Sequence, residues 1–508
     1  MMKIIEYFKQ LLNGTPDNYD AIEYEGDWWT WAKVRSCTNM LENALIEAGI
    51  KSSERIGLIL ENRPEHIATT LKLLTKNMPI VVLNPLQPTS RLIENITRLD
   101  IKIIIAGTAL LADKKLLEEI IKNRMIFKLS QSGETFLISN NNSNRTNKIN
   151  DQNIAIEMPT SGTTGTPKQV KLTYQQLDNA VTASVQVPKD KTLLMESVSL
   201  VSMPMVHISG LWGVLSALYT GRKIVLMSKF ALMPWIEAVE RYKIRATFLV
   251  PTALYDLLNS NVPPEKLHSL KIITTGSTSC SPKLIEQFFL RYGIRILATY
   301  GATEFAGAIA GWDSALHEKW WNKKAGSAGK TYSGIKIRIT GESGAELSAG
   351  QKGYLEVLTK PNWLVNQYEW VRTNDLANID SDGFLWILGR KDNIITRGGF
   401  KIQTEKIKNL LETHPSVKEA AVIAIPDTRL GSIPIAVIEI LPKYPVPSID
   451  ELVNLCRREL LPYERPSHLL IVDKLPRTPS SKIDQVELLN MTVTSLKKRP
   501  IANNSYQG

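Results

Sequence analysis

The sequence predicts an α/β protein with a large N-terminal part, a small β-rich unit and a small α+β C-terminal domain. Short buried strands alternate with helices through the first half of the chain, which is typical of mostly parallel sheets covered on both faces. The pattern changes to strand-like alternation after Gly334 and to mixed short strands and helices after Arg390. At about 100–200 residues per domain, 508 residues predict two to four domains.

The first half supplies a βαβ pattern. Residues 55–60 and 79–83 read as apolar strands on either side of a helix over residues 64–76, which begins after an Asn-Arg-Pro sequence. Residues 139–153 are a polar low-complexity stretch, which favours a surface loop. Further buried strands are expected at residues 101–106, 223–227, 247–250, 271–275 and 295–298.

The second half predicts two smaller units. Residues 335–340 and 354–358 alternate as strands around a glycine-containing turn, which indicates hairpins. A change of pattern after Arg390 divides the chain into an expected domain of residues 1–390 and one of residues 391–508. In the second domain, strands are expected at residues 420–425 and 433–440 and helices at residues 404–413 and 449–459.

Composition excludes several classes of protein. With 43% hydrophobic and 22% charged residues, the chain is neither collagen-like, nor a coiled coil, nor wholly disordered. Cys37, Cys280 and Cys456 form no C-x-x-C pair, which argues against a disulfide scaffold or zinc ribbon and for a reducing compartment. No apolar run reaches the roughly 18 residues of a membrane span, and residues 1–12 lack a signal-peptide core. We therefore expect a cytoplasmic protein without a membrane span.

The net charge leaves two interpretations open. Lys and Arg number 61 against 50 Asp and Glu, a formal charge of +11 that could attract nucleotides, phosphorylated cofactors or nucleic acid. The only compact basic cluster is at residues 497–499, so a basic composition spread over a large surface is favoured. No nucleic-acid partner is expected.

The most informative segment is "TSGTTGTPK", residues 160–168. Its glycines let backbone N–H groups turn inward and its hydroxyls add donors, so the segment can wrap an anion. It is not the G-x-x-x-x-G-K-[ST] phosphate loop, because Pro167 precedes Lys168, and it is not G-x-G-x-x-G. Taken alone, it could equally be an ordinary surface loop.

Four further motifs follow in order. They are "TYGATE" at 299–304, "WVRTNDLANIDSDGFLWILGR" at 370–390, "GRKDNIITRGGFKI" at 389–402 and "LPRTPSSKID" at 475–484. In this order and spacing, the five motifs resemble the adenylate-forming superfamily of acyl-CoA synthetases, adenylation domains and luciferases, over about residues 25 to 490. The resemblance implies a large N-terminal AMP-binding domain of two α/β subdomains and a small β-barrel-like unit, followed by a small, mobile α+β C-terminal domain.

The resemblance also implies ATP, Mg²⁺ and CoA. Attack of a carboxylate on the α-phosphate of ATP brings two anions together, so the site must supply fixed positive charge and hydrogen-bond donors. The loop would hold the β- and γ-phosphates, with Thr163 also acting in catalysis and metal binding. Its residues are Thr160, Ser161, Gly162, Thr163, Thr164, Gly165 and Lys168.

Glu304 is the implied Mg²⁺ ligand and a catalytic residue, since Mg²⁺ usually takes one or two carboxylates plus phosphates. Asp375 can accept both ribose hydroxyls, and Arg390 would contact the ribose as well. An ordinary salt bridge for Glu304 or Arg390, or a turn-forming role for Asp375, remains open. The residues implied around the adenine are Gly276, Ser277, Thr278, Tyr300, Gly301, Ala302 and Thr303.

The C-terminal motifs carry the remaining implied roles. Lys482 would reach the α-phosphate and the substrate carboxylate, Gly398 and Gly399 would line the pantetheine arm, and Asp392 would be the hinge between domains. A solvated lysine and an ordinary glycine turn are the alternatives. The motif departs from the family where Ser481 replaces the usual glycine, which restricts the backbone, and where Gln485 replaces a common arginine.

The segment "MPMVHISGLWG", residues 203–213, resembles the acyl-pocket motif of the family. It contains no acid from residue 204 to residue 212, and an unpaired buried ammonium would cost several kcal/mol, so amino acids are poor substrate candidates. Small residues in "FAGAIAGW", residues 305–312, would leave room for an apolar chain, or could reflect tight helix packing. The expected substrate residues are His207 (structural or also catalytic), Gly210, Trp212, Ala306 and Gly307.

These features together favour an ATP-dependent acyl-CoA ligase that activates an aliphatic or aryl carboxylic acid through an acyl-adenylate. A standalone acyl-adenylating enzyme loading an acyl or peptidyl carrier protein in trans is one alternative, and a non-catalytic acyl- or nucleotide-binding relative is another. A luciferase-like oxygenase is favoured by no feature of the sequence. The acid, the acceptor and the choice between monomer and homodimer stay open.

Overall fold

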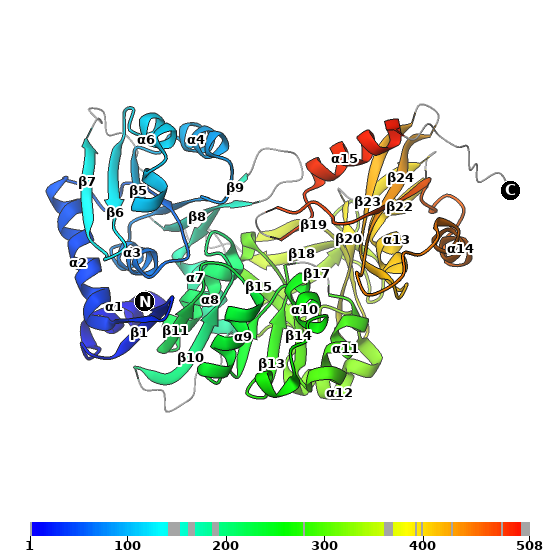
Figure 1. Cartoon of the computed structure of the whole chain (residues 1–508), viewed down its shortest axis with the longest axis horizontal. Helices are drawn as coiled ribbons and strands as arrows, with labels where there is room; N and C mark the ends of the chain where they lie inside the picture. The colour runs from blue at the N-terminus through cyan, green and yellow to red at the C-terminus, as the bar shows by residue number, and fades with distance from the viewer. Residues whose placement is uncertain are drawn as a thin grey trace. The chain divides into compact units, whose positions relative to one another are not determined.

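The computed structural model divides the chain into two compact units. The first comprises residues 1–325 and 331–334, and the second comprises residues 326–330 and 335–508 (Figure 1). The predicted boundary between residues 390 and 391 falls inside the second unit and stays a prediction. The structure describes residues 3–140, 153–160, 168–184, 193–277, 280–359, 369–391, 394–397, 400–427, 430–478 and 481–498.

A seven-stranded sheet forms the N-terminal part of the first unit, with a parallel centre and an antiparallel strand at each edge (Figure 1). Alternate strand residues enter two different cores, as the period of 2 along a strand requires. Leu58 and Ile105 pack with helices α1 (Lys3–Gly14), α2 (Trp31–Glu47) and α3 (Pro64–Thr75), whereas Ile59 and Ile104 pack with α4 (Thr89–Arg98) and α6 (Lys114–Ile120). In spatial order, the strands are β7 (Thr135–Asn140), β6 (Met125–Leu129), β5 (Ile103–Gly107), β3 (Ile56–Ile59), β4 (Ile80–Leu83), β8 (Ile154–Thr160) and β9 (Lys168–Thr173).

Two smaller sheets complete the first unit, and both are parallel in part. The four-stranded sheet runs β10 (Met195–Val201), β11 (Arg222–Leu226), β1 (Asp20–Tyr24) and β2 (Asp27–Thr30). The five-stranded sheet runs β12 (Ala246–Phe248), β13 (Ile272–Thr275), β14 (Arg295–Ala302), β15 (Gly307–Gly311) and β16 (Lys330–Thr331).

Helices separate these strands along the chain, as the alternating pattern predicts. Among the described residues of this unit, three helices have serine or aspartate N-caps that accept a main-chain hydrogen bond, at Asp113 before α6, Ser281 before α11 and Asp313 before α12. The helices are α1 (Lys3–Gly14), α2 (Trp31–Glu47), α3 (Pro64–Thr75), α4 (Thr89–Arg98), α5 (Thr108–Leu111), α6 (Lys114–Ile120), α7 (Tyr174–Ser184), α8 (Ile208–Tyr219), α9 (Leu232–Arg241), α10 (Pro251–Leu258), η1 (Pro264–Leu267), α11 (Pro282–Tyr292), η2 (Thr303–Phe305) and α12 (Ser314–Lys324).

The second unit contains an antiparallel four-stranded sheet and a mixed five-stranded sheet. The first runs β17 (Lys336–Thr340), β18 (Gly353–Thr359), β19 (Glu369–Ile379) and β20 (Leu385–Arg390). The second runs β22 (Phe400–Gln403), β21 (Ile394–Arg397), β24 (Gly431–Ile440) and β23 (Val417–Asp427), with β25 (His468–Val472) also paired to β24. Helices α13 (Thr404–Leu411) and α14 (Ile449–Glu459) contribute to one core of this sheet, and α15 (Gln485–Lys498) to another.

The predicted α/β class and the strands and helices expected from the sequence are confirmed, with shifts of a few residues at their ends. The expected surface loop over residues 139–153 was wrong at its N-terminal end, because Ser139 and Asn140 belong to strand β7. Ser139 is buried and pairs with Ile126, which explains why a polar sequence here is part of the sheet. Among the described residues, no helix is long and apolar enough to cross a membrane.

Candidate active site

The segment "TSGTTGTPK", residues 160–168, begins and ends at two paired strand ends. Thr160 ends β8 and Lys168 begins β9, and the two residues are register partners in an antiparallel pair. Thr160 and Lys168 therefore anchor the segment between them at one edge of the seven-stranded sheet. The predicted residues Ser161, Gly162, Thr163, Thr164 and Gly165 lie outside the described residues.

Glu304 lies in the short turn η2 between two antiparallel strands, β14 and β15. The turn closes through Ala306, which has a left-handed φ of 59°, and strand β9 contacts it. Glu304 is exposed, as a carboxylate that binds a metal–phosphate complex must be. No three His, Cys, Asp or Glu side chains gather as a metal site in the described part of the chain.

The residues expected around the adenine meet at the carboxyl ends of two parallel strands. Gly276 and Ser277 follow β13, and Tyr300 lies near the end of the neighbouring β14. A Cβ on Gly276 would stand 2.8 Å from Thr299 Oγ1, so no side chain fits between these strands. Ser277 has a left-handed φ of 70°. Thr278 lies outside the described residues.

Across the β14–β15 pair, Gly301 and Ala302 face Ala308 and Gly307. A Cβ on Gly301 would be 2.1 Å from the carbonyl oxygen of Gly307, so the hairpin closes only with glycine there. Thr303 and Glu304 therefore sit at the tip of a tightly packed hairpin, and the turn that presents the carboxylate is rigid at its base.

The expected substrate residues come from helix α8 and strand β15. His207 is the N-cap residue of α8, and a Cβ on Gly210 would stand 2.3 Å from the carbonyl oxygen of Pro204, so the preceding segment lies tightly against the first turn of the helix. A Cβ on Gly307 would stand 3.1 Å from Trp212 Cδ1. The structure thus brings Trp212 and Gly307 together, with buried Ala306 beside them.

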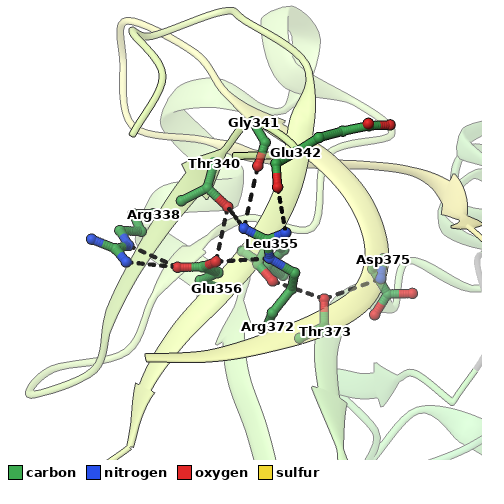
Figure 2. A network of polar contacts seen from close by, with 9 residues as sticks. All are labelled: Arg338, Thr340, Gly341, Glu342, Leu355, Glu356, Arg372, Thr373 and Asp375. Carbon is green, nitrogen blue, oxygen red and sulfur yellow. Dashed lines mark hydrogen bonds and ion pairs between the residues drawn. The ribbon is translucent and has the colours of Figure 1, made fainter. Parts of the chain in front are cut away.

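In the second unit, the two expected ribose residues are direct neighbours. Asp375 of β19 is the register partner of Arg390 of β20. The Asp375 main-chain nitrogen donates a hydrogen bond of 3.0 Å to Thr373 Oγ1, and Thr373 Oγ1 donates one of 3.0 Å to the Leu355 carbonyl (Figure 2). A threonine hydroxyl thereby fixes the strand just before Asp375.

Sequence reasoning missed the polar network that supports this strand, shown in Figure 2. Glu356 is buried and accepts hydrogen bonds of 2.9 Å from Arg338 Nε, Thr340 Oγ1 and Arg372 Nε. Burial acts to raise the pKa of Glu356, but the hydrogen bonds from Arg372, Arg338 and Thr340 hold that pKa below its usual value. The only sequence signal was a Glu at the central position of a strand otherwise apolar on its buried face.

Lys482 lies at the end of a hydrogen-bonded turn. Its carbonyl accepts from the Thr478 main-chain nitrogen at 2.8 Å, and Arg477 and Ile483 form a bridge on either side. Ser481 has a left-handed φ of 61°, so it occupies the backbone conformation that the usual glycine would adopt. Asp392, Gly398 and Gly399 lie outside the described residues.

Comparison with known proteins agrees with this arrangement. Residues 8–368 match the AMP-binding enzyme family and residues 406–482 match the AMP-binding enzyme C-terminal domain. The chain is 28% identical to a 2-succinylbenzoate–CoA ligase of Bacillus pumilus (96% of this chain, 98% of the relative) and 25% identical to the medium-chain fatty-acid–CoA ligase of Escherichia coli (95% and 89%).

A solved structure of o-succinylbenzoate coenzyme A synthetase from Bacillus subtilis, in complex with ATP and magnesium ion, has the same fold. Its TM-score is 0.77 at 24% identity, over 95% of this chain and 99% of that one. The family match extends over most of the chain and contains each of the motifs from residue 160 to residue 304. The chain therefore belongs to the family of AMP-binding enzymes, within the adenylate-forming superfamily.

Proposed function

We propose that this enzyme is an AMP-forming acid–CoA ligase whose acid is an aliphatic or aryl carboxylic acid without an ammonium group. In the first half-reaction, a carboxylate oxygen attacks the α-phosphorus of ATP and pyrophosphate leaves. In the second, the CoA sulfur attacks the acyl carbon and AMP leaves. Both acceptor and acid class go beyond family membership, and they are supported by relatives that are CoA ligases for aryl and aliphatic acids.

One observation carries this function. The turn that presents Glu304 contacts strand β9, whose first residue, Lys168, is the last residue of the TSGTTGTPK segment. The exposed Glu304 carboxylate and the strand that ends the TSGTTGTPK segment are therefore neighbours in the first unit. That pairing suits a metal–triphosphate complex, because the carboxylate can hold the metal while backbone and hydroxyl donors hold the phosphates.

The acid class follows from what surrounds Trp212. Residues 204–212 contain no acid, and Trp212 lies against Gly307, so this segment offers no anionic partner for an ammonium group. A free amino acid would have to bury an uncompensated charge there, which is unfavourable by several kcal/mol. An alkyl or aryl tail has no such penalty.

The test is a panel of carboxylic acids with ATP, with and without CoA, read by pyrophosphate release and product mass. We expect aliphatic and aryl acids without an ammonium group to trigger pyrophosphate release from ATP and, when CoA is present, to form a CoA thioester. Glu304→Gln should lower Mg²⁺-dependent turnover by about 10²-fold, the scale of losing one preorganised electrostatic partner. Glu318→Gln, at an exposed carboxylate of α12, is the matched control and should leave turnover unchanged.

Two results would contradict the proposal in different ways. Pyrophosphate release without any CoA thioester would replace CoA by a carrier protein as acceptor. A strong response to a common amino acid would overturn the assigned acid class.

A further inference from the structure

Asn62 joins two sheets of the first unit at residues 203–206, the segment that precedes helix α8. It lies between the end of β3 and the start of α3, and it is buried. Its Nδ2 donates to the carbonyl oxygens of Met203 at 2.9 Å and Met227 at 3.0 Å. Its Oδ1 accepts from the Met205 main-chain nitrogen at 2.7 Å.

These bonds use both amide hydrogens and the amide oxygen of Asn62. Each partner is a main-chain group more than 140 residues away along the chain, so the contact is tertiary. Met205 is buried, and shortening Asn62 would remove the acceptor of its main-chain nitrogen. A buried main-chain group that loses its partner drives the segment to rearrange.

The segment that Asn62 holds leads directly into His207 and helix α8. The His207 nitrogen donates to the Pro204 carbonyl at 3.0 Å, and Gly210 presses against that same carbonyl. Any displacement of residues 203–206 is therefore transmitted to the first turn of α8. Trp212 begins the next turn of α8 and lies against Gly307.

Met227 extends the same link to a second strand. It follows β11, and its nitrogen donates to the Val201 carbonyl at the end of β10 at 2.9 Å. Asn62 thus ties the ends of β10 and β11, in the four-stranded sheet, to the end of β3 in the seven-stranded sheet. Residues 203–206 are the connection that follows β10.

We propose that Asn62 is a positioning residue for the acid. It fixes residues 203–206, and through them the place of His207 and Trp212, so that acid affinity and acid selectivity depend on Asn62. This inference rests on the proposed function, which supplies the role of the segment. Asn62 has no hydrogen bond to residues 276–277 or 299–304, so ATP binding should be unaffected.

Asn62→Asp is the sharpest test, because it keeps the shape and the acceptor for Met205 but turns the donor into a second acceptor facing two carbonyl oxygens. We expect the apparent KM for the acid to rise about 10- to 100-fold at pH 7.5, as small misplacements near a reacting group do, with the KM for ATP within about twofold of wild type. At lower pH, a protonated carboxyl can donate again. The acid KM of the variant relative to wild type should therefore recover towards pH 5.5.

Asn62→Ser, a milder change, is the second variant if Asn62→Asp does not fold. Thr70→Val is the matched control, since it removes a buried hydrogen bond within α3 that does not touch residues 203–206. It should leave the acid KM and the order of preferred acids unchanged. Amide hydrogen exchange of residues 203–207 gives a readout that needs no substrate, and it should accelerate in Asn62→Ser but not in Thr70→Val.

The outcomes separate the two proposals. If wild type releases no pyrophosphate with any acid, the proposed function fails, and hydrogen exchange still decides whether Asn62 holds the segment. If the acid KM and the exchange of residues 203–207 are unchanged in the Asn62 variants, the positioning role is wrong. An equal rise in the KM for acid and for ATP would also overturn it.

Discussion

The hydroxyl of Thr373 accepts a hydrogen bond of 3.0 Å from the main-chain nitrogen of Asp375. The same hydroxyl donates to Leu355 on the neighbouring strand. Thr373 therefore connects the candidate ribose carboxylate to β18 through the backbone. Because β19 pairs irregularly with β18 between Tyr354 and Glu356, these bonds fix the strand where its regular pairing is interrupted.

Thr373→Val should weaken ATP binding more than it slows the chemical step. Valine keeps the shape but removes both hydrogen bonds, so Asp375 loses its fixed position. We expect the KM for ATP to rise about tenfold, on the scale of one lost hydrogen bond, with a smaller change in kcat. Thr373→Ser should restore the ATP KM, and a melting curve separates this effect from loss of stability. An ATP KM that stays at the wild-type value in Thr373→Val would contradict a positioning role.

Ser481 permits a paired test of the turn before Lys482. A non-glycine residue at a left-handed φ costs about 1–2 kcal/mol, which glycine avoids, although glycine also loses more entropy on folding. Ser481→Gly should therefore keep stability within about 1 kcal/mol and retain full pyrophosphate release. Ser481→Val should reduce pyrophosphate release by about tenfold or more, because a β-branched residue is strongly disfavoured at this φ.

Ser481 is exposed, so neither substitution disturbs a core. Pyrophosphate release and circular dichroism of both variants form the measurement. Equal activity in Ser481→Gly and Ser481→Val would mean that the backbone at this position does not control Lys482.

The sequence predicts the position of one of the two candidate carboxylates relative to the strands. Glu304 follows a strand-like segment in the sequence, and the structure places it in the turn after β14. Asp375 instead lies within β19, beside Arg390 of β20, which the polar residues before it do not indicate. Continuous apolar runs in the sequence also predict the central strands, because these strands are buried on both faces.

The contacts that support these residues could not be predicted in the same way. Asn62 meets Met203, Met205 and Met227 through side-chain bonds to main-chain groups, and main-chain groups carry no sequence signature. The network around Glu356 likewise depends on strand register, which a one-residue shift would reverse. The three-dimensional arrangement of the strands and loops, and not the residue types, therefore determines these hydrogen-bond partners.

Glu412 makes stability depend on pH. Its side chain is 12% exposed and accepts from the Ala420 nitrogen at 3.1 Å. Burial, the largest effect, raises the pKa of Glu412 to about 7. The folded carboxyl therefore keeps its proton between its ordinary range and about pH 7, whereas the unfolded chain loses it. Stability is lost as the pH rises through this window.

Glu412→Gln should remove this dependence. Its amide oxygen can still accept from Ala420, and the group no longer ionises. We expect the variant to be more stable than wild type at pH 8 by up to about 3 kcal/mol, and to show no gain at pH 4. Denaturant unfolding at both pH values is the measurement, with Glu459→Gln, at an exposed position of α14, as control. A difference between variant and wild type that is the same at both pH values would contradict the expected titration.

Lys482 and the Gly398-Gly399 pair are expected to serve different half-reactions at the same carboxyl carbon. Lys482 lies in the turn that follows β25, whereas the glycine pair falls between β21 and β22. One fixed arrangement of the C-terminal residues cannot easily present both groups. A rotation at Asp392 would present them in turn, because hinges are a few loop residues that absorb a large φ/ψ change.

Two substitutions should therefore divide the reaction in opposite ways. Asp392→Pro would fix φ near about −65° and restrict Lys391, so adenylation should persist while thioester formation falls at least about tenfold. Lys482→Ala should form little acyl-AMP from ATP, because it removes fixed positive charge where two anions meet, yet it should convert supplied acyl-AMP to thioester at close to the wild-type rate.

Lys474→Ala, at an exposed lysine just before the same motif, should leave both steps intact. Pyrophosphate release and CoA consumption with synthetic acyl-AMP are measured separately for each variant. Equal loss of both activities in Asp392→Pro and in Lys482→Ala would refute the two-state hinge, since a single rigid site would then have to perform both half-reactions.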